Sequence, residues 1–126
     1  MSGTLPRLVE SSFDSFPLTL FGAIDKMDWF RLRELLAPEV IYERPGYKPL
    51  IGLDQVMHFY RETRNVSIGS HIVERVAGDG SNLACHGRFN GMSKEPAPLV
   101  VEFCDFYVFS AGLLKYRKTF FYVPAV

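Results

Sequence analysis

Asp105 is the side chain of this sequence best placed for acid–base chemistry. It lies within residues 99–109, a run of β-branched and aromatic residues without Pro or Gly, which predicts a long strand. Alternate side chains of a strand share a face, so Asp105 is expected beside Leu99, Val101, Phe103, Tyr107 and Phe109. A carboxyl group in such apolar surroundings must pair with a cation, keep its proton, or line a cavity. The last two situations are typical of catalytic acids and bases.

The second half of the chain is predicted to form the sheet that holds Asp105. Strands are expected over residues 71–77, 83–90, 99–109 and 113–123. Glycine-containing turns at 78–80 and 110–112 and a loop with two prolines connect them. Such short connections between successive strands favour an antiparallel meander.

The first half is predicted to be mainly helical. Its expected elements are a helix over 16–26, a helix over 28–36 capped by Asp28, a short strand over 40–44, and a helix over 54–64 capped by Asp54. Residues 1–15 are expected to be an irregular lead-in, because Pro6 and Pro17 both resist a continuous helix.

Helices followed by strands indicate an α+β fold. We expect three helices from the N-terminal half to pack on a strongly curved, mainly antiparallel sheet, which makes a cone with a pocket at its open end. The whole chain, residues 1–126, is expected to be a single domain, because its length supports one hydrophobic core without a metal or a disulfide.

Composition excludes several classes of function. The chain has 14 basic and 14 acidic residues, a balance that does not favour binding to nucleic acid or to an anionic membrane. No apolar run is long enough to span a bilayer, and the N-terminus lacks the core of a signal peptide, so a cytoplasmic protein is expected. Cys85 and Cys104 form no metal-binding or CxxC motif and are expected to be buried thiols. No metal-binding, phosphate-binding or dinucleotide motif occurs, so no cofactor is expected.

Three segments carry the motifs of a known family. They are Ala-Ile-Asp-Lys-Met-Asp-Trp at 23–29, Leu-Leu-Ala-Pro-Glu-Val and Tyr-Glu-Arg-Pro-Gly within 35–46, and Asp-Phe-Tyr-Val-Phe and Arg-Lys-Thr-Phe-Phe within 105–121. With them the chain resembles a SnoaL-like domain of the nuclear-transport-factor-2-like superfamily, which includes ketosteroid isomerase and limonene epoxide hydrolase. The resemblance implies the cone fold and a homodimer. It leaves the reaction open, because this superfamily contains isomerases, cyclases, epoxide hydrolases, dehydratases and noncatalytic binding modules.

The resemblance gives Asp105 a specific role. Asp105, followed two residues later by Tyr107, is similar in placement to the protonated oxyanion-hole aspartate of ketosteroid isomerase. It would then act as an acid or stabilise an oxyanion, unless it only pairs with a pocket Arg or His. The isomerase also has a supporting tyrosine, whose matching position here is Leu20, and this departure argues against steroid isomerase activity. Tyr42, Tyr60 or Tyr107 could supply a hydroxyl instead.

The position of the general base has two readings. Counting back nine residues from Gly52, as in the isomerase, gives Glu43, whereas alignment on Pro45 gives Arg44. These neighbours cannot both point inward from a regular strand. Glu43 in the pocket would provide a second carboxyl group for proton transfer. Arg44 in the pocket would provide a fixed cation, suited to binding a carboxylate or to pairing with Asp105.

Further residues are expected in the same pocket. His71 opens a strand where related domains often carry a pocket histidine, and its ordinary pKa near 6.5 would allow it to relay protons. Arg117 shares a strand face with Leu113, Thr119, Phe121 and Val123, and Asp105 on the neighbouring strand is its expected partner. His86 is expected on the opposite face, away from the cone. The expected substrate-binding residues are Arg44, Arg117, Tyr42, Phe59, Tyr60, Leu83, Cys85, Phe103, Tyr107 and Phe121.

These residues predict a small cofactor-independent enzyme that isomerises or cyclises a hydrophobic, steroid- or polyketide-like molecule by acid–base catalysis. Asp105 would be the acid, with Glu43 or His71 as the base. An epoxide hydrolase of the same fold is one alternative, and a noncatalytic module for ligand binding or dimerisation is the other. The enzyme interpretation requires Asp105 and a second titratable group to face one cavity, whereas the binding module predicts that these groups form ion pairs beside a closed cavity.

Overall fold

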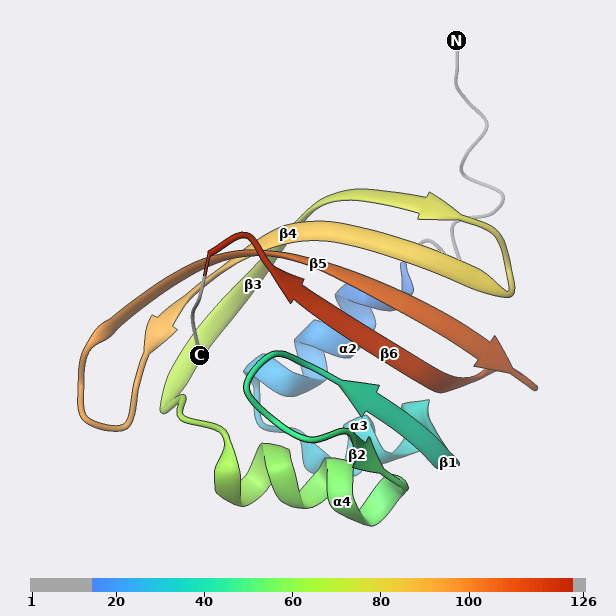
Figure 1. Cartoon of the computed structure of the whole chain (residues 1–126), viewed down its shortest axis with the longest axis horizontal. Helices are drawn as coiled ribbons and strands as arrows, with labels where there is room; N and C mark the ends of the chain where they lie inside the picture. The colour runs from blue at the N-terminus through green and yellow to red at the C-terminus, as the bar shows by residue number, and fades with distance from the viewer. Residues whose placement is uncertain (1–14, 124–126) are drawn as a thin grey trace, which may run out of the picture.

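A curved sheet arches over the helices, which pack against its concave face (Figure 1). The structure is a computed structural model that describes residues 15–123, so the lead-in expected over 1–15 lies outside it except for Ser15. The helical elements of the described part are α2 (Phe16–Asp25), α3 (Trp29–Leu35), α4 (Leu53–His58) and a π-helical turn, η1 (Phe59–Thr63). Its strands are β1 (Leu36–Glu43), β2 (Leu50–Ile51), β3 (Ile68–Gly78), β4 (Asn82–Met92), β5 (Pro98–Ser110) and β6 (Leu113–Phe121).

The six strands form one sheet in the order β2-β1-β6-β5-β4-β3. Strands β3 to β6 make the predicted antiparallel meander, and β1 adds to its edge by pairing in parallel with β6. The expected α+β fold, with three α-helices on a mainly antiparallel and strongly curved sheet, is confirmed. Within the described residues no helix is long and apolar enough to cross a membrane.

The start of α3 is as predicted, but the start of α4 is not. The Asp28 carboxylate accepts a hydrogen bond from the Arg31 amide at 3.1 Å and so caps α3. Gly52, rather than Asp54, precedes α4, and Asp54 lies one residue inside the helix. Gly52 has a φ of 91°, a conformation that glycine adopts at little cost, and the sharp exit from β2 requires it.

The end of the third helical segment also differs from the prediction of one continuous helix over 54–64. After His58 the chain widens into the π turn η1, and the Arg64 amide donates to the Phe59 carbonyl, five residues back, at 2.9 Å. The wider turn buries the neighbouring rings of Phe59 and Tyr60. Arg64, four residues after Tyr60, then reaches the same cavity as Tyr60.

A β-bulge changes the inward face of β6. Val108 pairs with Tyr116 and Phe109 pairs with Leu114, so Lys115 is an extra residue on β6. Leu114 is therefore the buried residue near the start of β6, and the prediction that Leu113 shares the face of Arg117 is wrong. Beyond the bulge, Arg117 and Thr119 point inward as predicted.

The hydrophobic core fills the space between the helices and the inner face of the sheet. Its largest fully buried side chains include Leu20, Ile24, Leu32, Met57 and Phe59. Among the inward residues of β5, Val101, Phe103, Asp105 and Tyr107 are buried, which confirms the predicted strand face. Asp105 is therefore a carboxylate inside an apolar core, and its polar partners decide its role.

Candidate functional site

A small, partly open cavity lies between the sheet and the segment around η1. Its volume is about 30 Å³, which is room for one or two water molecules. Its walls are formed by Tyr42, Arg44, Tyr60, Arg64, His71, Phe89, Val101, Phe103, Arg117, Thr119 and Phe121. Three guanidinium groups, an imidazole and several aromatic rings therefore surround one polar space.

Asp105 is fully buried but is not among the residues that line this cavity. Arg117 Nε donates to its Oδ2 at 2.9 Å, and the Tyr107 hydroxyl donates to the same oxygen at 2.8 Å. The Thr119 hydroxyl donates to Oδ1. Of the alternatives open for Asp105, the structure shows the ion pair with Arg117.

The hydrogen bonds continue from Asp105 to the cavity wall. A hydroxyl group has one hydrogen, and Thr119 gives its hydrogen to Asp105. Tyr42 must therefore be the donor in its 2.8 Å contact with Thr119. Arg44 Nη1 in turn donates to the Tyr42 oxygen at 3.3 Å. These bonds fix the Tyr42 hydroxyl. Tyr42 therefore lines the cavity, but its hydrogen is already donated to Thr119.

Arg117 is the permanent cation of the site. Burial alone would lower the pKa of its guanidinium, but the Asp105 carboxylate raises it well above the ordinary 12.5. Its Nη1 donates to the Tyr60 hydroxyl oxygen at 2.6 Å. Asp105 thus holds Arg117, and Arg117 presents its charge to the cavity through Tyr60.

Arg44, and not Glu43, faces the cavity. The Arg44 side chain is buried among aromatic rings, with its guanidinium carbon 4.9 Å from the ring centre of Phe59 and 5.4 Å from that of Phe121. The Glu43 carboxylate lies on the other side of the strand, where the Tyr116 hydroxyl donates to it at 2.7 Å and Lys118 lies 3.5 Å away. Glu43 is therefore outside the group that could exchange a proton with a ligand in the cavity.

His71 lines the cavity and is held by a residue that the sequence interpretation did not select. Asp25, at the end of α2, accepts from the His71 amide at 2.8 Å and contacts the ring Nδ1 at 2.6 Å. Because a carboxylate only accepts, Nδ1 carries the hydrogen and Nε2 keeps a lone pair in the neutral ring. The Phe21 ring stacks on the imidazole at 4.1 Å and fixes its plane.

The environment of His71 favours the neutral ring. Burial lowers the pKa of the imidazole, and although Asp25 raises it, the nearby Arg64 and Arg117 lower it further, so that the result is below the ordinary 6.5. At neutral pH His71 is then a proton acceptor oriented by a carboxylate, which is the arrangement of many general bases.

Tyr60 is the corresponding proton donor. Its oxygen accepts from Arg117, and among the residues that the structure describes none accepts its own hydrogen. Burial raises the pKa of the phenol, but the charges of Arg117, Arg64 and Arg44 outweigh burial and lower the pKa below the ordinary 10.0. The hydroxyl of Tyr60 is therefore polarised toward giving its proton to a ligand.

The remaining expected pocket residues divide into two groups. Phe103 and Phe121 line the cavity, whereas Phe59, Leu83, Cys85 and Tyr107 lie outside its lining. Burial raises the pKa of the Cys85 thiol to about 12, so the thiol is inert. Cys104 is partly exposed, on the other face of its strand, and the expectation that both thiols are buried is wrong for it.

The sequence interpretation missed Asp25, Arg64, Phe89, Val101 and Thr119. Helical spacing carried a signal for two of them, because Asp25 follows Phe21 by four residues and Arg64 follows Tyr60 by four. Strand alternation carried it for Val101 and Thr119, which share faces with Asp105 and Arg117.

The described residues contain no cluster of three or more His, Cys, Asp or Glu side chains that could hold a metal ion. What the cavity does bring together is a proton acceptor, His71, a proton donor, Tyr60, and guanidinium groups with positive charge. This set can move a proton between two atoms of a ligand and stabilise an oxyanion that forms between the two transfers.

Comparison with known proteins supports the family resemblance. The model of the SnoaL-like domain matches residues 19–117. No curated protein matches the chain.

Solved structures show the same fold at low sequence identity. A proposed SnoaL-like polyketide cyclase from Jannaschia sp. CCS1 has a TM-score of 0.79 and 16% identity, over 95% of this chain and 92% of the other. A proposed ketosteroid isomerase from Kribbella flavida has a TM-score of 0.73 and 19% identity, over 93% of this chain and 84% of the other. An LEH-like epoxide hydrolase of M. tuberculosis has a TM-score of 0.73 and 14% identity, over 83% of this chain and 78% of the other. At these identities the likeness establishes the fold alone.

Proposed function

The chain belongs to the SnoaL-like domain family, and we propose that it is an enzyme that isomerises or cyclises a small carbonyl compound by proton transfer. The observation that carries the proposal is the His71–Asp25 pair at 2.6 Å, in a cavity that also holds Tyr60 and Arg117. The family includes several reactions, so the choice rests on these side chains and not on the fold.

The first step uses His71 as the base. Its Nε2 takes a proton from the carbon next to a carbonyl group, and the electron pair of the broken C–H bond moves onto the carbonyl oxygen. Tyr60 donates its hydrogen to that oxygen, and Arg117 stabilises the negative charge behind it. Asp25 stabilises the imidazolium that forms at His71.

The second step returns the proton. In an isomerisation, His71 gives the proton to a different carbon, and the enol hydrogen goes back to Tyr60. In a cyclisation, the enol carbon attacks a second carbonyl group as the enol hydrogen returns to Tyr60, and the new alkoxide takes the proton from His71. Both routes restore His71 and Tyr60 to their starting states and use no cofactor.

The size of the cavity limits the substrate. Ligand pockets usually enclose roughly 300–1,000 Å³, whereas this cavity has about 30 Å³. A steroid- or polyketide-sized molecule therefore does not fit in the present arrangement. We propose a small substrate, or one whose reacting end alone enters while the rest extends through the opening.

Deuterium exchange tests this proposal on simple compounds that share the reacting group of the substrate. A panel of small ketones and keto acids in D₂O is followed by proton NMR, and the wild type is expected to accelerate loss of the α-hydrogen signal. His71→Asn should slow exchange by about 10²- to 10⁴-fold, the usual contribution of a general base. His58→Asn, at an exposed histidine on α4, is the matched control and should leave the rate unchanged.

Exchange by His71→Asn at the wild-type rate would contradict the role of His71. A wild type with no acceleration on any member of the panel would instead favour a noncatalytic binding module. The specific observation behind that second candidate is the pairing of Asp105 with Arg117 beside a cavity of only about 30 Å³.

Epoxide opening has weaker support. Asp105, the expected acid, already accepts three hydrogen bonds and does not line the cavity, so it is poorly placed to protonate an epoxide oxygen. A homodimer, implied by the family resemblance, stays a prediction.

A further inference from the structure

Arg64 is a half-buried cation whose charge is not balanced by an ion pair in the described part of the chain. No carboxylate of residues 15–123 lies within 4.0 Å of its guanidinium nitrogens, and its buried Nε has no hydrogen-bond partner there. Its contacts are with aromatic faces, since the guanidinium carbon lies 5.3 Å from the ring centres of both Tyr60 and Phe89. These rings hold the group in place but satisfy none of its donors.

The charges around Arg64 make this arrangement costly. Arg117 also lines the cavity, and its partner Asp105 lies outside the lining. The other nearby acid, Asp25, is bonded to His71. Burial lowers the pKa of Arg64, and Arg44 and Arg117 lower it further although Tyr60 and Tyr42 raise it, as expected for a cation that lacks an anion.

We propose that the ligand of this cavity carries a carboxylate group, and that Arg64 is the residue that binds it. A carboxylate would supply the missing acceptor for the Arg64 donors, in the bidentate geometry that a guanidinium favours. The inference rests on the proposed function for the reacting part of the same ligand, which would be a small keto acid or an unsaturated acid.

The walls of the cavity restrict the shape of the acid. Phe89, Phe103 and Phe121 are flat apolar surfaces on the sheet side, and Tyr60 is a flat surface on the η1 side. A planar, conjugated body attached to the carboxylate fits such surfaces. The small volume accepts the carboxylate and the atoms next to it, so a longer body must extend through the opening.

A binding experiment separates this inference from catalysis. Acetate and benzoate are titrated into the ¹⁵N-labelled protein in a low-salt buffer and compared with the neutral acetamide and benzamide, which have nearly the same shapes. The carboxylates are expected to bind on the order of tenfold or more tightly than the amides. The shifted signals should include residues of η1 and of the inner face of β5.

Two substitutions assign the preference to Arg64. Arg64→Gln should remove the preference for the carboxylate, while Arg64→Lys, which keeps the charge, should retain part of it. Arg61→Gln is the matched control, because Arg61 lies in η1, three residues before Arg64, but is exposed, and it should behave as the wild type. Melting temperatures of all variants establish that the comparison is made on folded protein.

Equal binding of acids and amides, no binding of either, or an unchanged preference in Arg64→Gln would overturn the inference. The titration and the exchange assay, both carried out on the wild-type protein, distinguish the two proposals. Carboxylate binding through Arg64 in a protein without exchange activity would leave this inference standing and reject the proposed reaction. Exchange activity without a preference for carboxylates would support the proposed reaction and reject the assignment of Arg64 as a carboxylate-binding residue.

Discussion

The two faces of the curved sheet carry the same kinds of ionisable group in opposite environments. On the inner face, Asp105 and Arg117 form an ion pair at 2.9 Å with side chains that are 0% and 7% exposed. On the outer face, Glu102 and His86 approach to 2.6 Å, but the side chains are 46% and 28% exposed. The short distances are similar, whereas the access of water differs.

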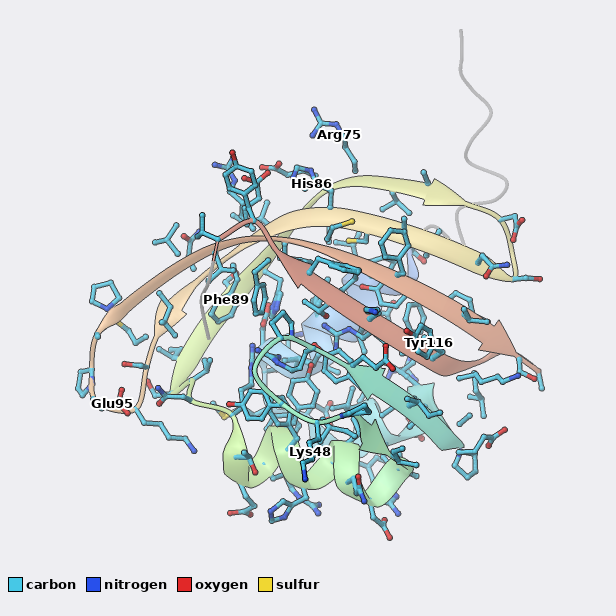
Figure 2. All side chains as sticks on the ribbon, in the orientation of Figure 1. Lys48, Arg75, His86, Phe89, Glu95 and Tyr116 are labelled. Carbon is cyan, nitrogen blue, oxygen red and sulfur yellow. The ribbon has the colours of Figure 1, made fainter. Side chains whose placement is uncertain are left out.

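The outer network extends over several ionisable side chains on neighbouring strands. Arg88 lies 2.7 Å from Glu74, and His86 lies between Glu74 and Glu102. Figure 2 shows His86 and Arg75 on the outside of the sheet and Phe89 on the side of the helices. Because water solvates and screens exposed pairs, each of them contributes little to the free energy of unfolding.

Water access, and not the number of charged groups, distinguishes the inner face, where the candidate site lies, from the outer face. The inner groups are shielded from bulk solvent, so the loss of a hydrogen-bond or ion-pair partner costs more there than on the outer face. A ligand that supplies a missing partner gains a large interaction there. The outer groups can exchange partners with solvent.

The largest expected effect is at Asp105. Asp105→Asn removes the charge that balances Arg117 and places an amide NH₂ against its donors, so we expect a loss of about 3–5 kcal/mol in the free energy of unfolding. Chemical denaturation measures this loss. The matched outer substitution, Glu102→Gln, should cost at most about 1 kcal/mol. Equal losses for the two variants would show that the faces do not differ as described.

A smaller effect is expected at Thr119. Thr119→Val removes the hydroxyl that donates to Asp105 and accepts from Tyr42, and leaves both groups buried with one bond fewer. We expect a loss of about 1–3 kcal/mol. Thr119→Ser, which keeps the hydroxyl, should lose less. A valine variant as stable as the wild type would show that the hydrogen-bonded chain does not hold Asp105.

The smallest effect is a pH dependence from His71. Burial lowers the pKa of the folded imidazole below the 6.5 of the unfolded chain, so the unfolded state binds the proton more readily. This contribution to stability is complete above pH 6.5 and is lost as the pH falls through the lower pKa of the folded state. Denaturation midpoints measured between pH 7.5 and 5 should fall more steeply for the wild type than for His71→Asn. Parallel curves would place His71 in contact with water.

The strands and the buried position of Asp105 could be predicted from the sequence because strand alternation is local. A single carboxyl group at an inward position of an apolar strand must be paired, protonated or placed at a cavity. Pairing with Arg117 was one of these alternatives. The neighbours Glu43 and Arg44 could not be separated, because alternation states that one points inward without stating which.

Other features depend on contacts that no local pattern contains. Asp25 and His71 are 46 residues apart, and their bond exists only because the end of α2 packs on the start of β3. The bulge at Lys115 shifts the inward face of β6 by one residue. Gly52, and not the expected Asp54, precedes α4, because the turn after β2 needs a residue with positive φ.

The π turn at η1 also has a consequence for how the binding site can change over evolution. A π turn holds about one residue more than an α turn, so it can be gained or lost by a single insertion or deletion. Removing one residue would rotate the following chain by about 100° about the helix axis. Arg64 would then leave the cavity, while the sheet and His71 stay in place. A single codon in this segment could therefore change which ligands a related domain accepts without altering its fold.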